Sequence, residues 1–176
     1  MPTRDATRQI TLMAVLAALG IAASFLGNVP LPFLATKVYP FQALLNVLAA
    51  VLLGPWQAVA VALVVGVLRI SMATGTVFAI PGGIFGALLA GYLVRWTGRW
   101  WTALLGELIG TGLVAALVAY PIAVYMLGKK VAALAYVVPF ATASLSGVVL
   151  AAVLTPILLR VPAIAGRLPS AQRRGA

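Results

Sequence analysis

The residues of this chain that could do chemistry are few, and they lie within long apolar stretches. Gln42 and Asn46 are four residues apart, so on a helix they share one face. Lys37 and Tyr39 come just before them. An ammonium, a phenol and two amides in one place offer both donors and acceptors, which suits a small neutral or zwitterionic heterocycle. The alternative is that Asn46 only bridges two helices.

Two ionisable residues, Arg69 and Glu107, also fall within apolar segments. A guanidinium in hydrocarbon costs roughly 2.5–3.5 kcal/mol on insertion scales, so Arg69 must pair, reach the membrane surface or line a wet cavity. Two roles are equally supported for Arg69: binding of a ligand, or a side chain that only extends to the membrane surface. Glu107 and Thr111 are expected to be structural polar residues of the helix bundle. No direct Arg69–Glu107 pair is expected, because their predicted depths differ by several turns.

Several kinds of chemistry are excluded by what the sequence lacks. It contains no cysteine and no histidine, and its acidic residues are Asp5 and Glu107 alone. Disulfides, thiolate or imidazole metal sites, imidazole catalysis and paired carboxylates are therefore excluded. A phosphate-binding GxxxxGK[ST] loop is also absent. We expect no catalytic residues, no metal and no other cofactor, and the chain is not predicted to be an enzyme.

Composition predicts that these residues lie within a membrane. Hydrophobic residues make up 64% of the chain and the mean hydropathy is +1.14, and a helical span needs roughly 20 apolar residues. We predict an all-α polytopic membrane protein with a six-helix transmembrane domain over 9–160, a cytoplasmic N-terminal segment 1–8 and a basic cytoplasmic tail 161–176. The predicted spans are 9–26, 40–53, 56–72, 82–94, 101–127 with a kink at Pro121, and 138–159.

The positive charges predict an orientation rather than a nucleic-acid partner. The net charge is +10, but the basic residues sit at the ends of apolar stretches, as topology signals do. Both termini and eight arginines are predicted to be cytoplasmic: Arg4, Arg8, Arg95, Arg99, Arg160, Arg167, Arg173 and Arg174. Lys37, Lys129 and Lys130 are predicted on the opposite side, to which the irregular segments 28–39 and 73–81 would also belong.

Small residues recur every four positions in three of the predicted spans. Ala14, Ala18 and Ala22 form one such row. The others are the small residues at 82, 86 and 90 and the glycines at 106 and 110. Small residues at this spacing let another backbone approach closely. Packing within the bundle is the favoured interpretation for the last two rows.

Several segments together resemble a known family. They are KVYPFQALLN at 37–46, LGPW at 53–56, FAIPGGIFGALLAG at 78–91, GELIGTG at 106–112 and AYPIA at 119–123. The chain resembles, over about residues 9–160, the substrate-capture (S) components of energy-coupling factor (ECF) transporters, specifically the ThiW type. The resemblance implies an S-component-like bundle in the cell membrane. Its partners would be a transmembrane coupling protein and two cytoplasmic ATPases.

The resemblance also implies a ligand and a site. The ligand would be the thiamine precursor hydroxyethylthiazole, captured at the outer face, with thiamine or another small vitamin as the alternative. The row Ala14, Ala18 and Ala22 would contact the coupling protein. Together with the polar residues above, the substrate-binding candidates are Lys37, Tyr39, Gln42, Asn46, Arg69, Thr76, Phe78, Gly82, Gly83 and Tyr120.

Charge favours the neutral thiazole over thiamine, because no acidic residue is predicted in the outer half of the bundle to meet a cationic thiazolium. Contacts with aromatic rings, at roughly 0.5–2 kcal/mol each, would be the substitute. Two alternatives of other classes stay open. One is a membrane scaffold without a small ligand, and the other is a carrier that works alone.

Overall fold

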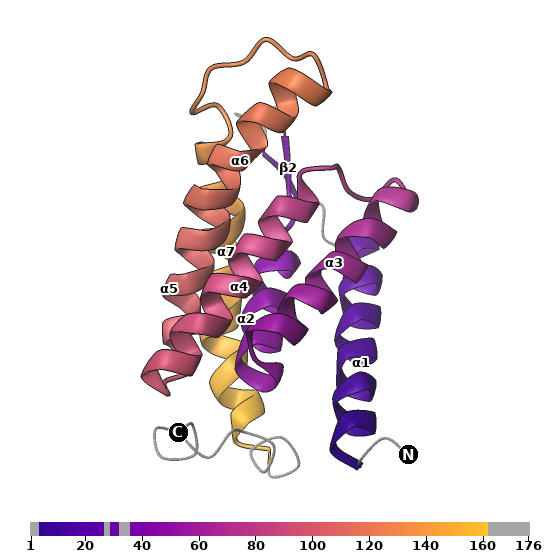
Figure 1. The fold of residues 1–176 in the computed structure, drawn as a ribbon, viewed down its shortest axis with the longest axis vertical. Helices are drawn as coiled ribbons and strands as arrows, with labels where there is room; N and C mark the ends of the chain where they lie inside the picture. Colours follow the sequence, from indigo (N-terminus) through magenta and orange to yellow (C-terminus); the bar gives the residue numbers. More distant parts are fainter. Residues whose placement is uncertain (1–3, 27–28, 32–35, 162–176) are drawn as a thin grey trace.

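The computed structural model describes residues 4–26, 29–31 and 36–161, which form a bundle of helices that run alternately up and down (Figure 1). A two-stranded antiparallel hairpin follows the first helix. The elements, in chain order, are α1 (Arg4–Leu26), β1 (Val29–Leu31), β2 (Thr36–Val38), α2 (Pro40–Leu53), α3 (Pro55–Ser71), α4 (Ala79–Thr97), α5 (Thr102–Ile109), η1 (Gly110–Ala115), α6 (Ala116–Pro121), η2 (Ile122–Met126) and α7 (Val137–Leu159).

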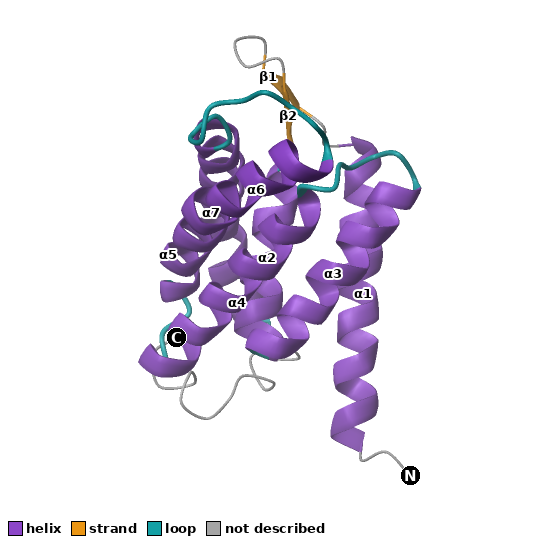
Figure 2. Cartoon of the chain, turned by 45° about the horizontal axis from the view of Figure 1, so that its top comes forward, coloured by secondary structure: helices purple, strands orange, loops and turns teal. Residues whose placement is uncertain are grey.

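The two ends of the bundle differ in what they carry. The β1–β2 hairpin and the segment between η2 and α7 lie together at one end, which we call the hairpin end (Figure 2). The start of α1 and the end of α7 lie at the other, which we call the terminal end (Figure 1). The α2–α3 and α4–α5 connections are also at the terminal end.

Helix α2 is the centre of the bundle. It contacts α1, α3, α4, α5 and α7, and every residue from Gln42 to Val51 is buried. Proline at the first position starts both α2 and α3, where its missing N–H removes no helical hydrogen bond. Between these helices Gly54 has a φ of 91°, a left-handed conformation that favours glycine and permits a one-residue turn.

The prediction of an all-helical membrane bundle is confirmed. Four apolar helices are long enough to cross a membrane: residues 6–25 of α1, α4, the continuous helix from Thr102 to Met126, and α7. The shorter apolar helices α2 and α3 complete the six. The predicted span 40–53 coincides with α2, and the other predicted ends fall within a few residues of the observed ones, apart from α1 and α4. Helix α1 begins at Arg4, five residues before the predicted span.

Two local predictions are wrong. Helix α4 begins at Ala79 rather than at Gly82, because Pro81 lies in its first turn, where a proline is tolerated. The segment 28–39 was expected to be irregular, yet it contains the β1–β2 hairpin, in which Val29 pairs with Val38. Pro30 disfavours a strand in general, but both strands of a two-stranded sheet are edges, where proline is accepted.

The helix from Thr102 to Met126 changes its winding twice. It is π-helical in η1 and again in η2, which starts directly after Pro121. Pro121 has no N–H to donate, which explains a change of hydrogen-bond register at this point. The kink predicted at Pro121 stays a prediction. The first π stretch begins at Gly110 and includes Thr111.

Close approach of α4 and the 102–126 helix depends on glycine. A Cβ on Gly106 would lie 2.5 Å from the Cα of Ala90, and one on Gly110 would lie 2.8 Å from the Cα of Gly86. Both neighbours are backbone atoms that cannot turn away. The small-residue rows on these two helices therefore pack against each other within the bundle, as predicted.

This packing can be tested by adding one methyl group. Gly106→Ala should lower the free energy of unfolding by about 1–3 kcal/mol, because the methyl group forces the two helices apart. Gly66→Ala on α3 is the matched control, since its Cβ would make only ordinary contacts, the nearest at 3.7 Å from Ile80. Thermal unfolding of the ligand-free protein in detergent measures both. Equal stability of the two variants would contradict the packing argument.

Candidate functional site

A chain of hydrogen bonds between side chains runs through the interior of the bundle. Arg69 Nη1 donates to Gln42 Oε1 at 3.1 Å, and Gln42 Nε2 donates to Asn46 Oδ1 at 3.4 Å. Asn46 Nδ2 then donates to Glu107 Oε2 at 3.1 Å. We call these four residues, together with Tyr39, which lies against Arg69, and Thr111, which bonds to Glu107, the polar chain. It joins α2, α3 and the 102–126 helix.

Glu107 forms the inner end of the polar chain and is 0% exposed. Thr111 Oγ1 lies 2.7 Å from Glu107 Oε1 and 2.8 Å from the carbonyl oxygen of Gly82, so its hydroxyl can donate to either. Ser144 on α7 donates to the backbone carbonyl of Glu107 at 3.2 Å. Within the described part of the chain, no cation pairs with the carboxyl group. Neutral donors alone therefore surround Glu107.

Arg69 forms the outer end, one turn from the hairpin end of α3. Its Cζ lies 3.6 Å from the centroid of the Tyr39 ring, and Nη2 donates to the carbonyl oxygen of Thr74 at 3.4 Å. The residue is 5% exposed, so its guanidinium is enclosed by protein. Its Nε is buried and has no hydrogen-bond partner among the described residues.

Tyr39 extends the polar chain to α1. Its hydroxyl donates to the backbone carbonyl of Gly20 at 2.6 Å. Close by, the hydroxyl oxygens of Ser24 and Thr74 lie 3.1 Å apart. The hairpin end of α1 is thus held to the same residues that hold Arg69.

Glycines on α4, which carry no side chain, leave room for the polar chain. A Cβ on Gly86 would overlap Thr111 and Glu107 and would lie 2.8 Å from Asn46 Nδ2. One on Gly83 would lie 3.2 Å from Gln42 Nε2. The sequence predicts Gly83 as a site residue and Gly86 only as a member of a packing row. The four-residue spacing of small residues was the one available signal for Gly86.

The predicted site residues do not all meet in one place. Six of the ten substrate-binding candidates belong to the polar chain or lie against it: Tyr39, Gln42, Asn46, Arg69, Gly82 and Gly83. Gly82 contributes its carbonyl to Thr111. Phe78 lies at the start of α4, with its ring 4.8 Å from that of Tyr136 and 6.0 Å from Lys129 Nζ. These aromatic residues lie at the hairpin end, above the polar chain.

The other three candidates stand apart. Thr76 is exposed in the loop before α4, and Tyr120 is half-buried on α6. Neither contacts the polar chain through its side chain in the described structure. Lys37 lies in β2, opposite Pro30 in the hairpin. Gly20, Thr74 and Ser144, which support the polar chain, were missed, because their contacts use backbone groups or distant helices that sequence spacing does not reveal.

The alanine row on α1 faces away from the bundle. Ala14, Ala18 and Ala22 are exposed, whereas Leu16, Ala17 and Gly20 on the same helix are buried. Helix α1 packs mainly against α2 and α3, which leaves it at the edge of the bundle (Figure 1). A smooth strip of methyl groups is therefore open to lipid or to another helix.

Comparison with known proteins gives one result. Residues 10–161 match the family described as Thiamine-precursor transporter protein (ThiW). Neither the curated proteins nor the solved structures contain a significant match. The match covers most of the chain, and the membrane-helix bundle agrees with a transporter rather than an enzyme. The chain belongs to the ThiW family of thiamine-precursor transporters and is a multi-pass membrane protein.

Proposed function

We propose that this protein is the substrate-capture subunit of an ATP-driven importer and that it binds hydroxyethylthiazole at the hairpin end. The transmembrane coupling protein and two cytoplasmic ATPases of an ECF module would supply the energy. The observation that carries the proposal is the buried polar chain, whose outer end at Arg69 retains an unpaired donor.

The unpaired Nε of Arg69 favours a ligand that accepts a hydrogen bond. Leaving a buried donor without a partner costs about 1–3 kcal/mol, so a bound acceptor would recover that energy. The ring nitrogen and the hydroxyl oxygen of hydroxyethylthiazole are both acceptors. Phe78 and Tyr136, whose rings lie 4.8 Å apart at the same end, offer aromatic surface to the thiazole ring.

Charge favours the uncharged thiazole over thiamine. The guanidinium of Arg69 is part of the proposed site and would repel a thiazolium. The carboxyl of Glu107 lies deeper, separated from Arg69 by Gln42 and Asn46, and it already accepts hydrogen bonds from Asn46 and Thr111. A cationic ligand at the hairpin end would therefore lack a carboxylate partner.

Basic residues support an orientation with both termini in the cytoplasm and the hairpin end outside. Arg8 on α1, Arg95 on α4, Arg99 and Arg160 all belong to the terminal end of the bundle. Lys37, Lys129 and Lys130 belong to the hairpin end. Arg167, Arg173 and Arg174 lie outside the described residues. Membrane proteins usually carry more basic residues on their cytoplasmic side.

Helix α1 supports docking to a coupling protein through Ala14, Ala18 and Ala22. The row is exposed at the edge of the bundle, and small residues allow close helix–helix contact within a membrane. The hydrogen bond from Tyr39 to Gly20 connects this helix to the polar chain. Ligand occupancy and the position of α1 could thus influence each other.

Calorimetric titration of the detergent-solubilised protein tests the ligand. We expect saturable binding of hydroxyethylthiazole, weaker binding of thiamine and no binding of the pyrimidine precursor. Tighter binding of thiamine would keep the capture function and contradict the charge argument. If folded protein bound none of the three, the proposal would fail and a scaffold role would gain support.

Substitution of two glutamines tests whether the polar chain contributes to ligand binding. Gln42→Ala removes the acceptor of Arg69 and should weaken binding at least tenfold, since a hydrogen bond to a charged group contributes about 1.5–3 kcal/mol. Gln57→Ala is the matched control, because Gln57 lies on α3 at the terminal end, away from the polar chain. Titration with hydroxyethylthiazole should show an unchanged affinity for the control. Similar losses in both variants would remove Gln42 from the site.

Docking through α1 can be separated from ligand capture. Ala18→Trp should abolish uptake into vesicles that also hold the coupling protein and ATPases, while ligand affinity stays within about twofold. The bulky ring would keep the partner helix at a distance. Val149→Trp on α7, an exposed position with 57% exposure, is the control and should retain uptake. Normal uptake by the Ala18 variant would refute the proposed contact.

A further inference from the structure

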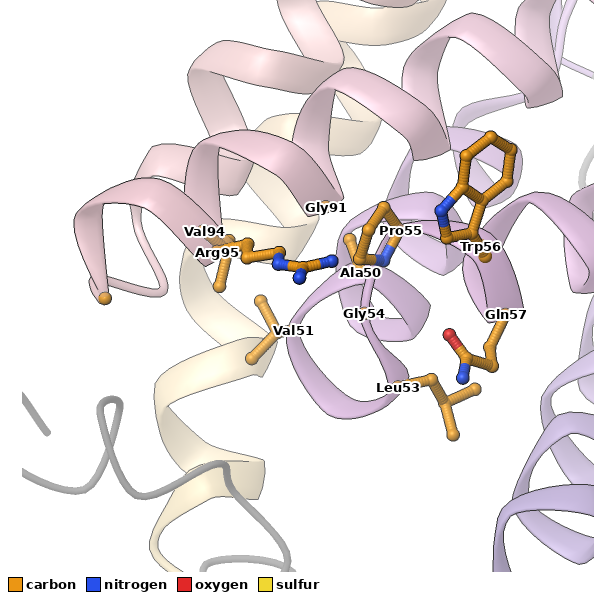
Figure 3. Close-up of a pocket in the computed structure, with 11 residues that line it drawn as sticks. Ala50, Val51, Leu53, Gly54, Pro55, Trp56, Gln57, Gly91, Val94 and Arg95 are labelled. Carbon is orange, nitrogen blue, oxygen red and sulfur yellow. The ribbon is translucent and has the colours of Figure 1, made fainter. Parts of the chain in front are cut away.

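A cavity of about 420 Å³ lies at the terminal end of the bundle, and no residue of the polar chain lines it. It is formed where α2 ends, α3 begins and α4 approaches its last turn (Figure 3). Ala50, Val51 and Pro55 form its inner wall. The proposed function leaves this cavity without a role.

One positive charge points into the cavity. Arg95 extends from α4 towards Ala50 and Pro55, across the gap between the helices (Figure 3). Within the described residues its guanidinium has no hydrogen-bond or ion-pair partner, and no acidic residue lines the cavity. A guanidinium in this situation is suited to a phosphate group, which it can bind through two parallel hydrogen bonds.

Aromatic rings at the mouth indicate the depth of the cavity in the membrane. Trp56 lines it and is 63% exposed. Tyr92 meets Trp56 edge-on at 6.3 Å and lies 5.7 Å from Trp96, which is 75% exposed. Exposed tryptophan and tyrosine gather at the level of lipid headgroups. The cavity therefore opens where the phosphates of the bilayer lie.

We propose that this cavity binds the headgroup of an anionic glycerophospholipid. Arg95 would hold the phosphate, and the first carbons of the acyl chains would lie along the apolar wall made by Val51, Leu53 and Val94. An apolar wall next to a single guanidinium suits a lipid better than a free phosphate, which would gain nothing from the wall. The proposal is independent of the thiazole site, which lies at the opposite end of the bundle.

Native mass spectrometry of the delipidated full-length protein tests this proposal. The protein is mixed with phosphatidylglycerol or phosphatidylcholine, and the bound lipids are counted. We expect at least one phosphatidylglycerol to be retained in preference to phosphatidylcholine. Arg95→Gln should weaken that retention about tenfold, as expected when one charge-assisted contact is lost. Arg160→Gln, an exposed arginine at the same end that does not line the cavity, should bind like the unaltered protein.

Three outcomes would overturn the proposal. They are equal retention of both lipids, unchanged retention in the Arg95 variant, and displacement of phosphatidylglycerol by an equal concentration of soluble glycerol phosphate. The last would identify a soluble phosphate as the ligand. Calorimetry with hydroxyethylthiazole on the Arg95 variant should give the affinity of the unaltered protein, so failure here and failure of the thiazole site are distinguishable.

Discussion

A guanidinium and a carboxyl group are held inside an apolar helix bundle without touching each other, and two amides on α2 connect them. Arg69, Gln42, Asn46 and Glu107 are each at most 8% exposed. In a bilayer no water is available to satisfy such groups, so each must find its hydrogen bonds within the protein. The hydrogen bonds between α2, α3 and the 102–126 helix meet this requirement, and the glycines of α4 leave room for them.

Helix α2 can serve this purpose because it lies at the centre of the bundle. Its 14 residues reach only about 21 Å at 1.5 Å per residue, less than the hydrocarbon thickness of about 30 Å. Protein surrounds it from Gln42 to Val51, so its short length exposes little backbone to lipid. Glycine at Gly83 and Gly86 then lets α4 pass directly beside the amides. Helix α4 is thus closely packed against the polar groups.

The two ends of the bundle have different chemistry. The hairpin end holds the buried donor of Arg69 and the aromatic pair Phe78 and Tyr136, which together suit the proposed capture of a small neutral ring. At the terminal end, Arg95 faces a cavity beside Trp56, which suits a lipid phosphate. Helix α1 runs along the edge between them and offers its row of alanines to a partner. The sites proposed for ligand capture, lipid binding and docking therefore occupy separate surfaces of a small protein.

The sequence by itself determined the class of the protein, the number of helices and most of their ends. Hydropathy, prolines and glycines act locally, so the turn at Gly54 and the start of α2 at Pro40 could be predicted. Local rules were ambiguous at Pro81, which suits either a loop or a first helical turn, and at Pro30, which is acceptable in an edge strand.

Only the tertiary structure decided how the polar residues meet. The Arg69–Gln42 bond joins residues 27 positions apart, and the Asn46–Glu107 bond joins residues 61 apart. In a soluble helix the apolar face would reveal which side points inward. Lipid is as apolar as the interior of a bundle, so most side chains here are compatible with either side. Packing between helices that are distant in sequence therefore fixes how each helix is rotated about its own axis. That rotation in turn brings together the polar chain and leaves the space beside Gly86.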